Sequence, residues 1–116
     1  MDNYTENRPW GSFTILDEGD GFKVKRLSVN SGHKLSLQYH HQRSEHWTVV
    51  HGVATVIVGE DVKKLKVNES VYIPLTEIHA LSSEGEELLQ RIEVQVGEYL
   101  VEDDIVQLAG RYGRVE

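Results

Sequence analysis

The sequence predicts an all-β domain, built as a sandwich or barrel, because short alternating segments follow one another between turn residues. Residues 34–40 alternate between polar and apolar side chains, which is the period of a strand with one buried face. Residues 47–50 and 53–58 are rich in β-branched side chains and are separated at Gly52. Many short strands at such spacing are typical of all-β sandwiches and barrels.

The other elements follow from the same two signals, β-rich runs and turn clusters. The expected strands cover residues 13–15, 22–29, 34–40, 47–50, 53–58, 64–67, 71–73 and 88–96. Only Glu102–Leu108 is expected to form a short C-terminal helix, because Asp103 and Asp104 would lie in its first turn, where carboxylates stabilise the helix dipole.

Length and charge restrict the function. The 116 residues are the length of one domain, so we expect a single domain over residues 1–116. The net charge of −7 argues against nucleic acid as a partner, since phosphate backbones require a basic surface. A small phosphorylated ligand needs only a few local cations and is compatible with this charge.

Cysteine usage and hydropathy suggest a compartment. There is no cysteine, so disulfides and thiolate metal sites are excluded. No signal peptide is visible, and no apolar run approaches the length of a membrane span. We therefore expect a cytoplasmic protein with no membrane partner.

A set of metal-ligating side chains is the most informative feature. Gln38 and His40 point from the same strand face, because side chains at i and i+2 share a face, with Ser36 and Lys34 farther along it. Glu45 follows after a short turn, and His79 follows Pro74 on a distant strand. An amide oxygen, a carboxylate and two imidazoles suit zinc, iron(II), manganese or nickel. The predicted metal ligands are Gln38, His40, Glu45 and His79.

The spacing of these residues resembles the motifs of the cupin superfamily. The run from Gly32 through Gln38, His40 and Glu45 to Gly52 resembles the first motif, G-x5-H-x-H-x3–4-E-x6-G, with Gln38 in place of the first histidine. The second motif, G-x5-P-x-G-x2-H-x3-N, can be laid over Asn68, Pro74, Thr76, His79 and Ser83, of which Pro74 and His79 match. The resemblance implies a cupin barrel, a double-stranded β-helix or jelly roll.

A more specific resemblance runs from about Arg8 to Arg114. The segments that carry it are 8–11 (RPWG), 35–38 (LSLQ), 43–47 (RSEHW), 72–74 (YIP), 92–95 (IEVQ), 102–106 (EDDIV) and 111–114 (RYGR). Together they resemble the type II mannose-6-phosphate isomerase domain, which is often fused behind a mannose-1-phosphate guanylyltransferase, and this chain would be a free-standing version. The chain departs from that pattern at Gln42, at Arg91 (where an aliphatic residue is usual) and at Ala109-Gly110.

The resemblance implies interconversion of mannose 6-phosphate and fructose 6-phosphate through an enediol. A divalent metal, zinc in first place and manganese, cobalt, nickel or iron as alternatives, would stabilise the developing negative charge. Lys34, Ser36, Arg43 and Arg111 are the expected ligands of the sugar phosphate. Glu93 is the expected base, with Arg43 also assigned to the catalytic set.

Each of these features also has a structural interpretation. Lys34 is as well explained as a solvated lysine at a strand end, and Trp10 and Trp47 as core or barrel-cap residues. His46 should point away from Glu45, to the outer face of its strand. Two other functions are compatible with the site: a non-catalytic sugar-phosphate-binding module and an iron(II) dioxygenase. By analogy with other cupins, we expect a homodimer.

Overall fold

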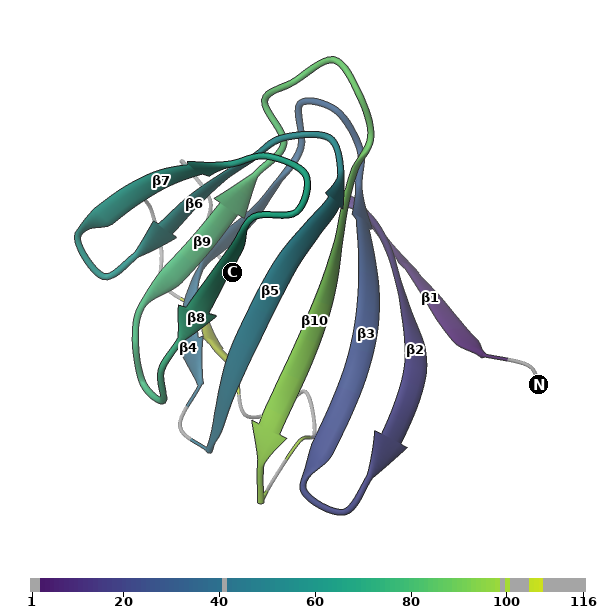
Figure 1. The fold of residues 1–116 in the computed structure, drawn as a ribbon, viewed down its shortest axis with the longest axis vertical. Helices are drawn as coiled ribbons and strands as arrows, with labels where there is room; N and C mark the ends of the chain where they lie inside the picture. The colour runs from purple at the N-terminus through teal and green to yellow at the C-terminus, as the bar shows by residue number, and fades with distance from the viewer. Residues whose placement is uncertain (1–2, 41, 99, 101–104, 108–116) are drawn as a thin grey trace.

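The computed structural model places two antiparallel β-sheets face to face, with the core between them (Figure 1). It describes residues 3–40, 42–98, 100 and 105–107, excepting the side chains of Ser36, Leu37 and residues 105–107. The first sheet has the order β1 (Tyr4–Arg8), β2 (Gly11–Gly19), β3 (Phe22–Val29), β10 (Leu89–Gly97), β5 (Arg43–His51) and β8 (Ser70–Ile73). The second has the order β11 (Ile105–Gln107), β4 (Lys34–His40), β9 (His79–Ser82), β6 (Ala54–Val58) and β7 (Asp61–Leu65). The predicted all-β fold is confirmed.

The predicted C-terminal helix is wrong for the part of it that the structure describes. Ile105–Gln107 form a strand, β11, whose Ile105 pairs with His40 of β4. Two β-branched residues and an available strand edge favour pairing, and this tertiary gain outweighs the weak local preference for a helix. The other positions of Glu102–Leu108 lie outside the described residues. Within the described residues, no helix is long and apolar enough to span a membrane.

The interior divides into an apolar half and a polar half. The apolar half is a cluster of buried side chains from both sheets: Val29, Trp47, Val49, Ala54, Val56, Leu65, Val71, Ile73, Leu81 and Leu89. Along β10 the inward positions begin with Leu89 and continue with Arg91, Glu93 and Gln95, all of them buried. A strand that buries three polar side chains in succession marks the half in which a functional site is expected.

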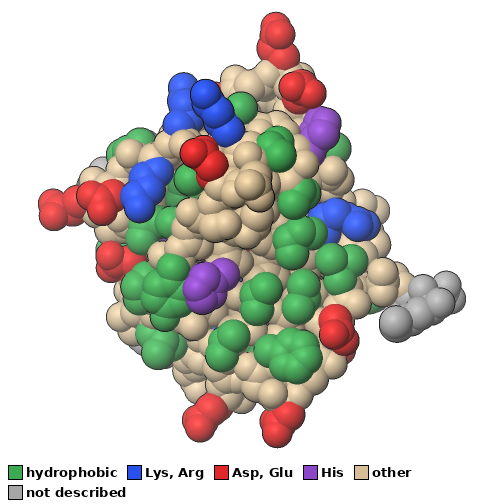
Figure 2. Space-filling model, in the orientation of Figure 1, with side chains coloured by type: hydrophobic (Ala, Val, Ile, Leu, Met, Phe, Trp, Pro, Cys, Tyr) green, Lys and Arg blue, Asp and Glu red, His purple; other side chains and the backbone are tan. Residues whose placement is uncertain are grey.

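The outer face of the first sheet is exposed and partly apolar. Val50, Tyr72 and Val96 are each exposed on it, and Figure 2 shows apolar side chains gathered over this sheet. His46 lies on the same face, as predicted, with its ring 4.6 Å from that of Tyr72. The polar half of the interior therefore lies behind β5 and β10, on their opposite face.

The two residues that replace the glycines of the second cupin motif, Asn68 and Thr76, have glycine-like backbone conformations. Asn68 has a φ of 76° and Thr76 a φ of 63°, and they are the non-glycine residues with positive φ among the described residues. Asparagine tolerates this region, whereas a β-branched residue is strained in it. The backbone has kept the turn that the motif encodes, although the glycines are absent.

Candidate metal centre

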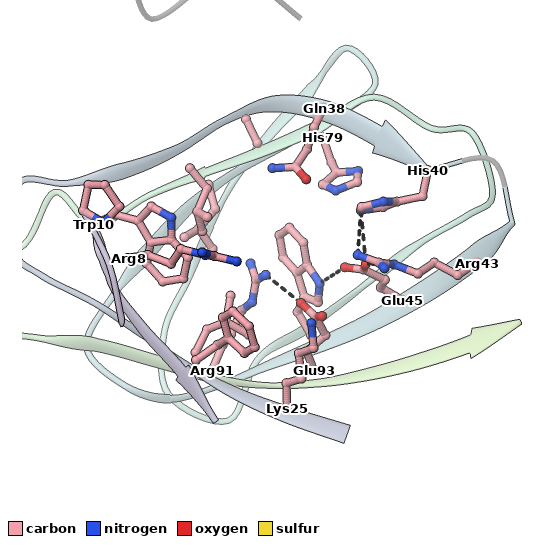
Figure 3. A pocket seen from close by; sticks show the side chains of 17 residues that line it. Arg8, Trp10, Lys25, Gln38, His40, Arg43, Glu45, His79, Arg91 and Glu93 are labelled. Carbon is pink, nitrogen blue, oxygen red and sulfur yellow. Dashed lines mark hydrogen bonds and ion pairs between the residues drawn. The ribbon is translucent and has the colours of Figure 1, made fainter. Parts of the chain in front are cut away.

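Three buried side chains from both sheets converge at one point. His40 ends β4 and His79 begins β9 in the second sheet, while Glu45 lies on β5 in the first. One potential ligand atom from each of the three lies within 4.8 Å of the others. Figure 3 shows the two imidazoles above the Glu45 carboxylate at one end of a cavity. The residues that the sequence predicted as ligands, though distant along the chain, are thus brought together.

The donor set fits a divalent transition metal. His40 Nε2 lies 3.2 Å from Glu45 Oε2. Two atoms that each lie about 2.1 Å from one metal ion are separated by roughly 3.0–3.5 Å, depending on the geometry, so the distance between these two atoms fits a shared ion. Arg43 contacts both atoms in this structure, with Nη2 3.3 Å from His40 Nε2 and Nε 2.8 Å from Glu45 Oε2, so its guanidinium would move when an ion binds. Gln38 pairs with His79 across the β4–β9 ladder and lines the cavity, which places its amide beside the three ligands. His40, Glu45 and His79 would hold the ion, with Gln38 as a further oxygen donor.

Neighbouring groups orient two of the three ligands. The Nδ1–H of His79 donates to the backbone carbonyl of Glu77 at 3.0 Å, because a carbonyl can only accept, and this leaves a lone pair on Nε2. Trp47 Nε1 donates to Glu45 Oε1 at 2.8 Å, and Arg43 Nε donates to Glu45 Oε2 at 2.8 Å. The carboxylate and the imidazole are therefore held in defined orientations before a metal binds.

The electrostatics of the site favour the protonation states that metal binding requires. Burial alone would raise the pKa of Glu45, but the charges of Arg43, His79 and Arg91 and the Trp47 hydrogen bond outweigh it, so the pKa lies below its usual value. Burial lowers the pKa of His79, and the charge of Glu45 only partly offsets this. An ionised carboxylate and a neutral imidazole are the forms that bind metal.

A cavity of about 470 Å³ extends from the metal site between the sheets. Four cationic side chains line it, together with two carboxylates, two imidazoles, one amide and an apolar remainder. These lining residues are Arg8, Pro9, Trp10, Phe13, Lys25, Leu27, Leu35, Gln38, His40, Arg43, Glu45, Trp47, His79, Ala80, Leu81, Arg91 and Glu93. A divalent ion would add to the excess of positive charge, so the cavity is suited to an anionic ligand.

The inward side chains of β10 form a buried polar chain. Arg91 Nη2 donates to Glu93 Oε1 at 2.7 Å, and Gln95 Nε2 donates to Glu93 Oε2 at 2.5 Å. Burial lowers the pKa of Arg91 from its usual value, while the charges of Glu93 and Glu45 oppose the shift. Both oxygens of Glu93 are thus occupied by neighbours in this structure.

The predicted binding residues of β4 are placed differently from the expectation. Leu35 lines the cavity and Lys34 does not, whereas Gln38 and His40 do. The pairing of β4 with β9 shifts register between Leu35 and Gln38, and such an irregularity reverses which side chains face inward. The expectation that Lys34 shares the face of Gln38 is therefore wrong, and its role in binding the ligand stays a prediction. The side chain of Ser36 and the whole of Arg111 lie outside the described residues.

Several residues of the cavity were not among the predicted site residues. Arg8, Lys25 and Arg91 supply three of its four cations, and Trp47 is a partner of Glu45 as well as a core residue. A signal for Arg91 existed in the sequence. It lies two residues before Glu93 on one strand, so any face that buries Glu93 also buries Arg91.

Comparison with known proteins agrees with the fold and specifies the family. The family described as mannose-6-phosphate isomerase C-terminal matches residues 2–110. A mannose-1-phosphate guanylyltransferase of Escherichia coli (strain K12) is 52% identical over 108 residues, covering 93% of this chain and 23% of that protein. The mannose-1-phosphate guanylyltransferase ManC of Salmonella typhimurium is 50% identical, covering 93% and 22%. The crystal structure of an RmlC-like cupin from Shewanella frigidimarina superposes with a TM-score of 0.76 at 19% identity, covering 87% of each chain, which supports the cupin fold.

The relatives correct the expected activity. The motifs of the sequence predict a mannose-6-phosphate isomerase, whereas relatives at about 50% identity are named mannose-1-phosphate guanylyltransferases. This chain spans less than a quarter of the length of those relatives. The isomerase prediction is therefore wrong, and the base role given to Glu93 is withdrawn with it. A cupin barrel and its ligand set establish a type of site and not a reaction, because one fold hosts many functions. With a match over nearly its whole length, the chain belongs to the family described as mannose-6-phosphate isomerase C-terminal.

Proposed function

We propose that this domain is a metal-dependent binding module that takes a mannose phosphate into its cavity. The proposal is based on one observation: the three buried candidate ligands, His40, Glu45 and His79, lie in the wall of a cavity whose charged side chains are mainly cationic. A bound metal ion would bind sugar hydroxyl or phosphoryl oxygens, and nearby cations would hold the phosphate. We choose mannose as the sugar because two relatives are named mannose-1-phosphate guanylyltransferase.

Zinc is the proposed metal. Two imidazoles and one carboxylate with room for another ligand form a common zinc set. The cytoplasmic location and the homodimer expected from the sequence stay predictions.

The binding test uses the protein stripped of metal with a chelator and then reloaded with zinc. Isothermal titration calorimetry with mannose 1-phosphate and mannose 6-phosphate should detect binding by the zinc-loaded protein and much weaker binding by the stripped protein. Neutral mannose should bind more weakly than either phosphate, because it cannot use the cations. Equal affinities for mannose and its phosphates, or no binding of any of them, would reject the proposal.

The metal site is tested separately. We expect His79→Asn to weaken zinc binding by more than about 100-fold, because loss of a direct ligand should exceed the 10- to 100-fold cost of losing an outer partner. His46→Asn is the matched control, since His46 lies on the exposed outer face of β5. Zinc content after dialysis and competition with a chelating dye measure both variants. If His79→Asn kept wild-type zinc affinity, the ligand assignment would be wrong.

A further inference from the structure

Arg91 carries hydrogen-bond donors that the protein leaves without acceptors. The side chain is 4% exposed, and its Nε and Nη1 atoms are buried with no hydrogen-bond partner. These two nitrogens hold three N–H bonds. Buried polar groups are nearly always paired, and leaving charged donors unpaired is costly. An acceptor from outside the chain is therefore expected at this position.

The protein holds the guanidinium in place through its other contacts. Its Cζ lies 3.5 Å from the centre of the Trp47 ring, and Nη2 donates to Glu93. Stacking on an aromatic face together with an ion pair fixes the plane of an arginine. Neither contact uses Nε or Nη1, so the same arrangement that fixes the group leaves these donors available to a ligand in the cavity.

Two further cations lie on the same side of the cavity. Lys25 Nζ is 4.5 Å from the centre of the Phe13 ring, and Arg8 Cζ is 5.4 Å from the centre of the same ring. Figure 3 shows Arg8 and Arg91 extending into the cavity on the side away from the two histidines. Glu93 accepts from Arg91 and Glu6 forms an ion pair with Arg8, so part of this charge is balanced within the protein. This concentration of positive charge favours an anion.

The metal triad and Arg91 are connected through one side chain. Trp47 donates to Glu45 from its indole nitrogen and carries Arg91 on its ring face, while the ring of His79 meets it edge-on at 5.5 Å. A ligand that reaches both sites must pass along this indole. Such a ligand needs an oxygen donor at one end for the metal and an oxyanion at the other.

We propose that Arg91 is the anchor of an oxyanion subsite, assisted by Lys25 and Arg8, which binds the phosphate or carboxylate group of a sugar whose other oxygens face the metal triad. This inference adds an anion-binding site to the proposed function, and the identity of the sugar rests on that proposed function. Its effect is on which ligand binds, and not on whether the metal binds.

The direct test observes Arg91 in the wild-type protein. In the zinc-loaded protein, the Nε–H signal of Arg91 is assigned in a ¹H–¹⁵N spectrum by its loss in Arg91→Lys. Addition of mannose 1-phosphate should shift this signal, and addition of mannose should not. Inorganic phosphate and a hexuronic acid are titrated in parallel, so that a shift with the hexuronic acid alone identifies the anion as a carboxylate.

The binding test uses a variant that keeps the charge balance of the interior. Arg91→Leu alone would leave Glu93 buried without its partner, so it is combined with Glu93→Gln. We expect the double variant to bind mannose 1-phosphate about 10- to 100-fold more weakly, the effect of losing hydrogen bonds to a charged group, with unchanged zinc affinity. Arg26→Leu is the control, since Arg26 neighbours Lys25 on β3 and does not line the cavity.

The outcomes separate this inference from the proposed function. If phosphate or hexuronic acid shifts the Arg91 signal and no mannose phosphate binds, the subsite stands and the proposed function fails. If mannose 1-phosphate binds the wild type and the double variant equally well, and no anion moves the signal, the subsite is rejected and water is the partner of these donors.

Discussion

At the scale of single residues, Trp47 connects the metal site with the rest of the cavity. It is 2% exposed and belongs to the apolar cluster, yet its indole nitrogen donates to Glu45 and its ring supports Arg91. A side chain with an apolar body and one polar N–H is able to serve both functions. Phenylalanine at position 47 would keep an aromatic ring in the core but lack the N–H that donates to Glu45. The Trp47–Glu45 hydrogen bond can therefore be tested separately from the packing of the ring.

We predict that Trp47→Phe weakens zinc binding while the domain stays folded. The variant keeps an aromatic ring but removes the donor to Glu45 Oε1, and loss of a partner in the second coordination sphere typically costs 10- to 100-fold in metal affinity, so we expect about 10-fold or more. Competition with a chelating dye measures the affinity, and circular dichroism checks the fold. Zinc affinity equal to that of the wild type would show that Glu45 is oriented without this hydrogen bond.

At the scale of elements, the turn between β8 and β9 positions His79. The backbone N–H of Thr76 donates to the carbonyl of His40 at 2.8 Å, which ties this turn to the end of β4. The φ of 63° at Thr76 places a β-branched residue in the left-handed region, at a cost of roughly 1–2 kcal/mol. The turn therefore joins two of the proposed metal ligands, His40 and His79, through a strained residue.

We predict that Thr76→Gly stabilises the domain. Relief of the strain exceeds the extra backbone entropy of glycine, so we expect a gain of about 1 kcal/mol and a rise in melting temperature of roughly 3–5 °C. Asn68→Gly is the matched control and should change stability less, because asparagine already tolerates a positive φ. Thermal unfolding followed by circular dichroism measures both variants. A larger gain from Asn68→Gly than from Thr76→Gly would contradict the strain argument.

At the scale of the whole molecule, the site makes stability depend on pH. Burial holds the pKa of His79 below its usual value of about 6.5. Below that pH the unfolded chain binds a proton that the folded protein does not, so the free energy of unfolding falls as the pH falls. Glu45 acts in the same direction but only at lower pH, since its pKa is lowered from about 4.5.

We predict that the metal-free protein loses stability between pH 7 and pH 5 because of His79. The contribution of one group has a slope of at most about 1.4 kcal/mol per pH unit. Urea unfolding at several pH values in the presence of a chelator measures this slope, and His79→Gln should flatten it. An equally steep loss in His79→Gln would assign the pH dependence to other groups.

Local pattern was sufficient for most of the strands and for the convergence of His40, Glu45 and His79, but β1 (Tyr4–Arg8) and β9 (His79–Ser82) were not among the expected strands. Strand alternation and the order of Gln38, His40, Glu45 and His79 depend only on period and spacing, which are visible along the chain. The isomerase activity could not be predicted in the same way, because reaction type does not follow from a fold and its ligand set.

Two predictions failed because pairing between strands overrode a local pattern: the helix at residues 102–108 and the inward position of Lys34. Carboxylates near one end predict a helix at residues 102–108, but β4 offers residues 105–107 a strand edge, and pairing outweighs this local preference. Strict alternation predicts that Lys34 faces inward, but a register shift between Leu35 and Gln38 reverses its side.

Residue type and spacing were enough to predict an all-β cupin domain and the convergence of His40, Glu45 and His79 inside it. The sequence did not predict that Arg8, Lys25 and Arg91 line the same cavity, or that Nε and Nη1 of Arg91 are buried there without a hydrogen-bond partner. Strands that are far apart along the chain, such as β3 and β10, become neighbours in a sheet, and the two sheets then pack against each other. These long-range contacts depend on sheet register and are not visible in any local sequence pattern.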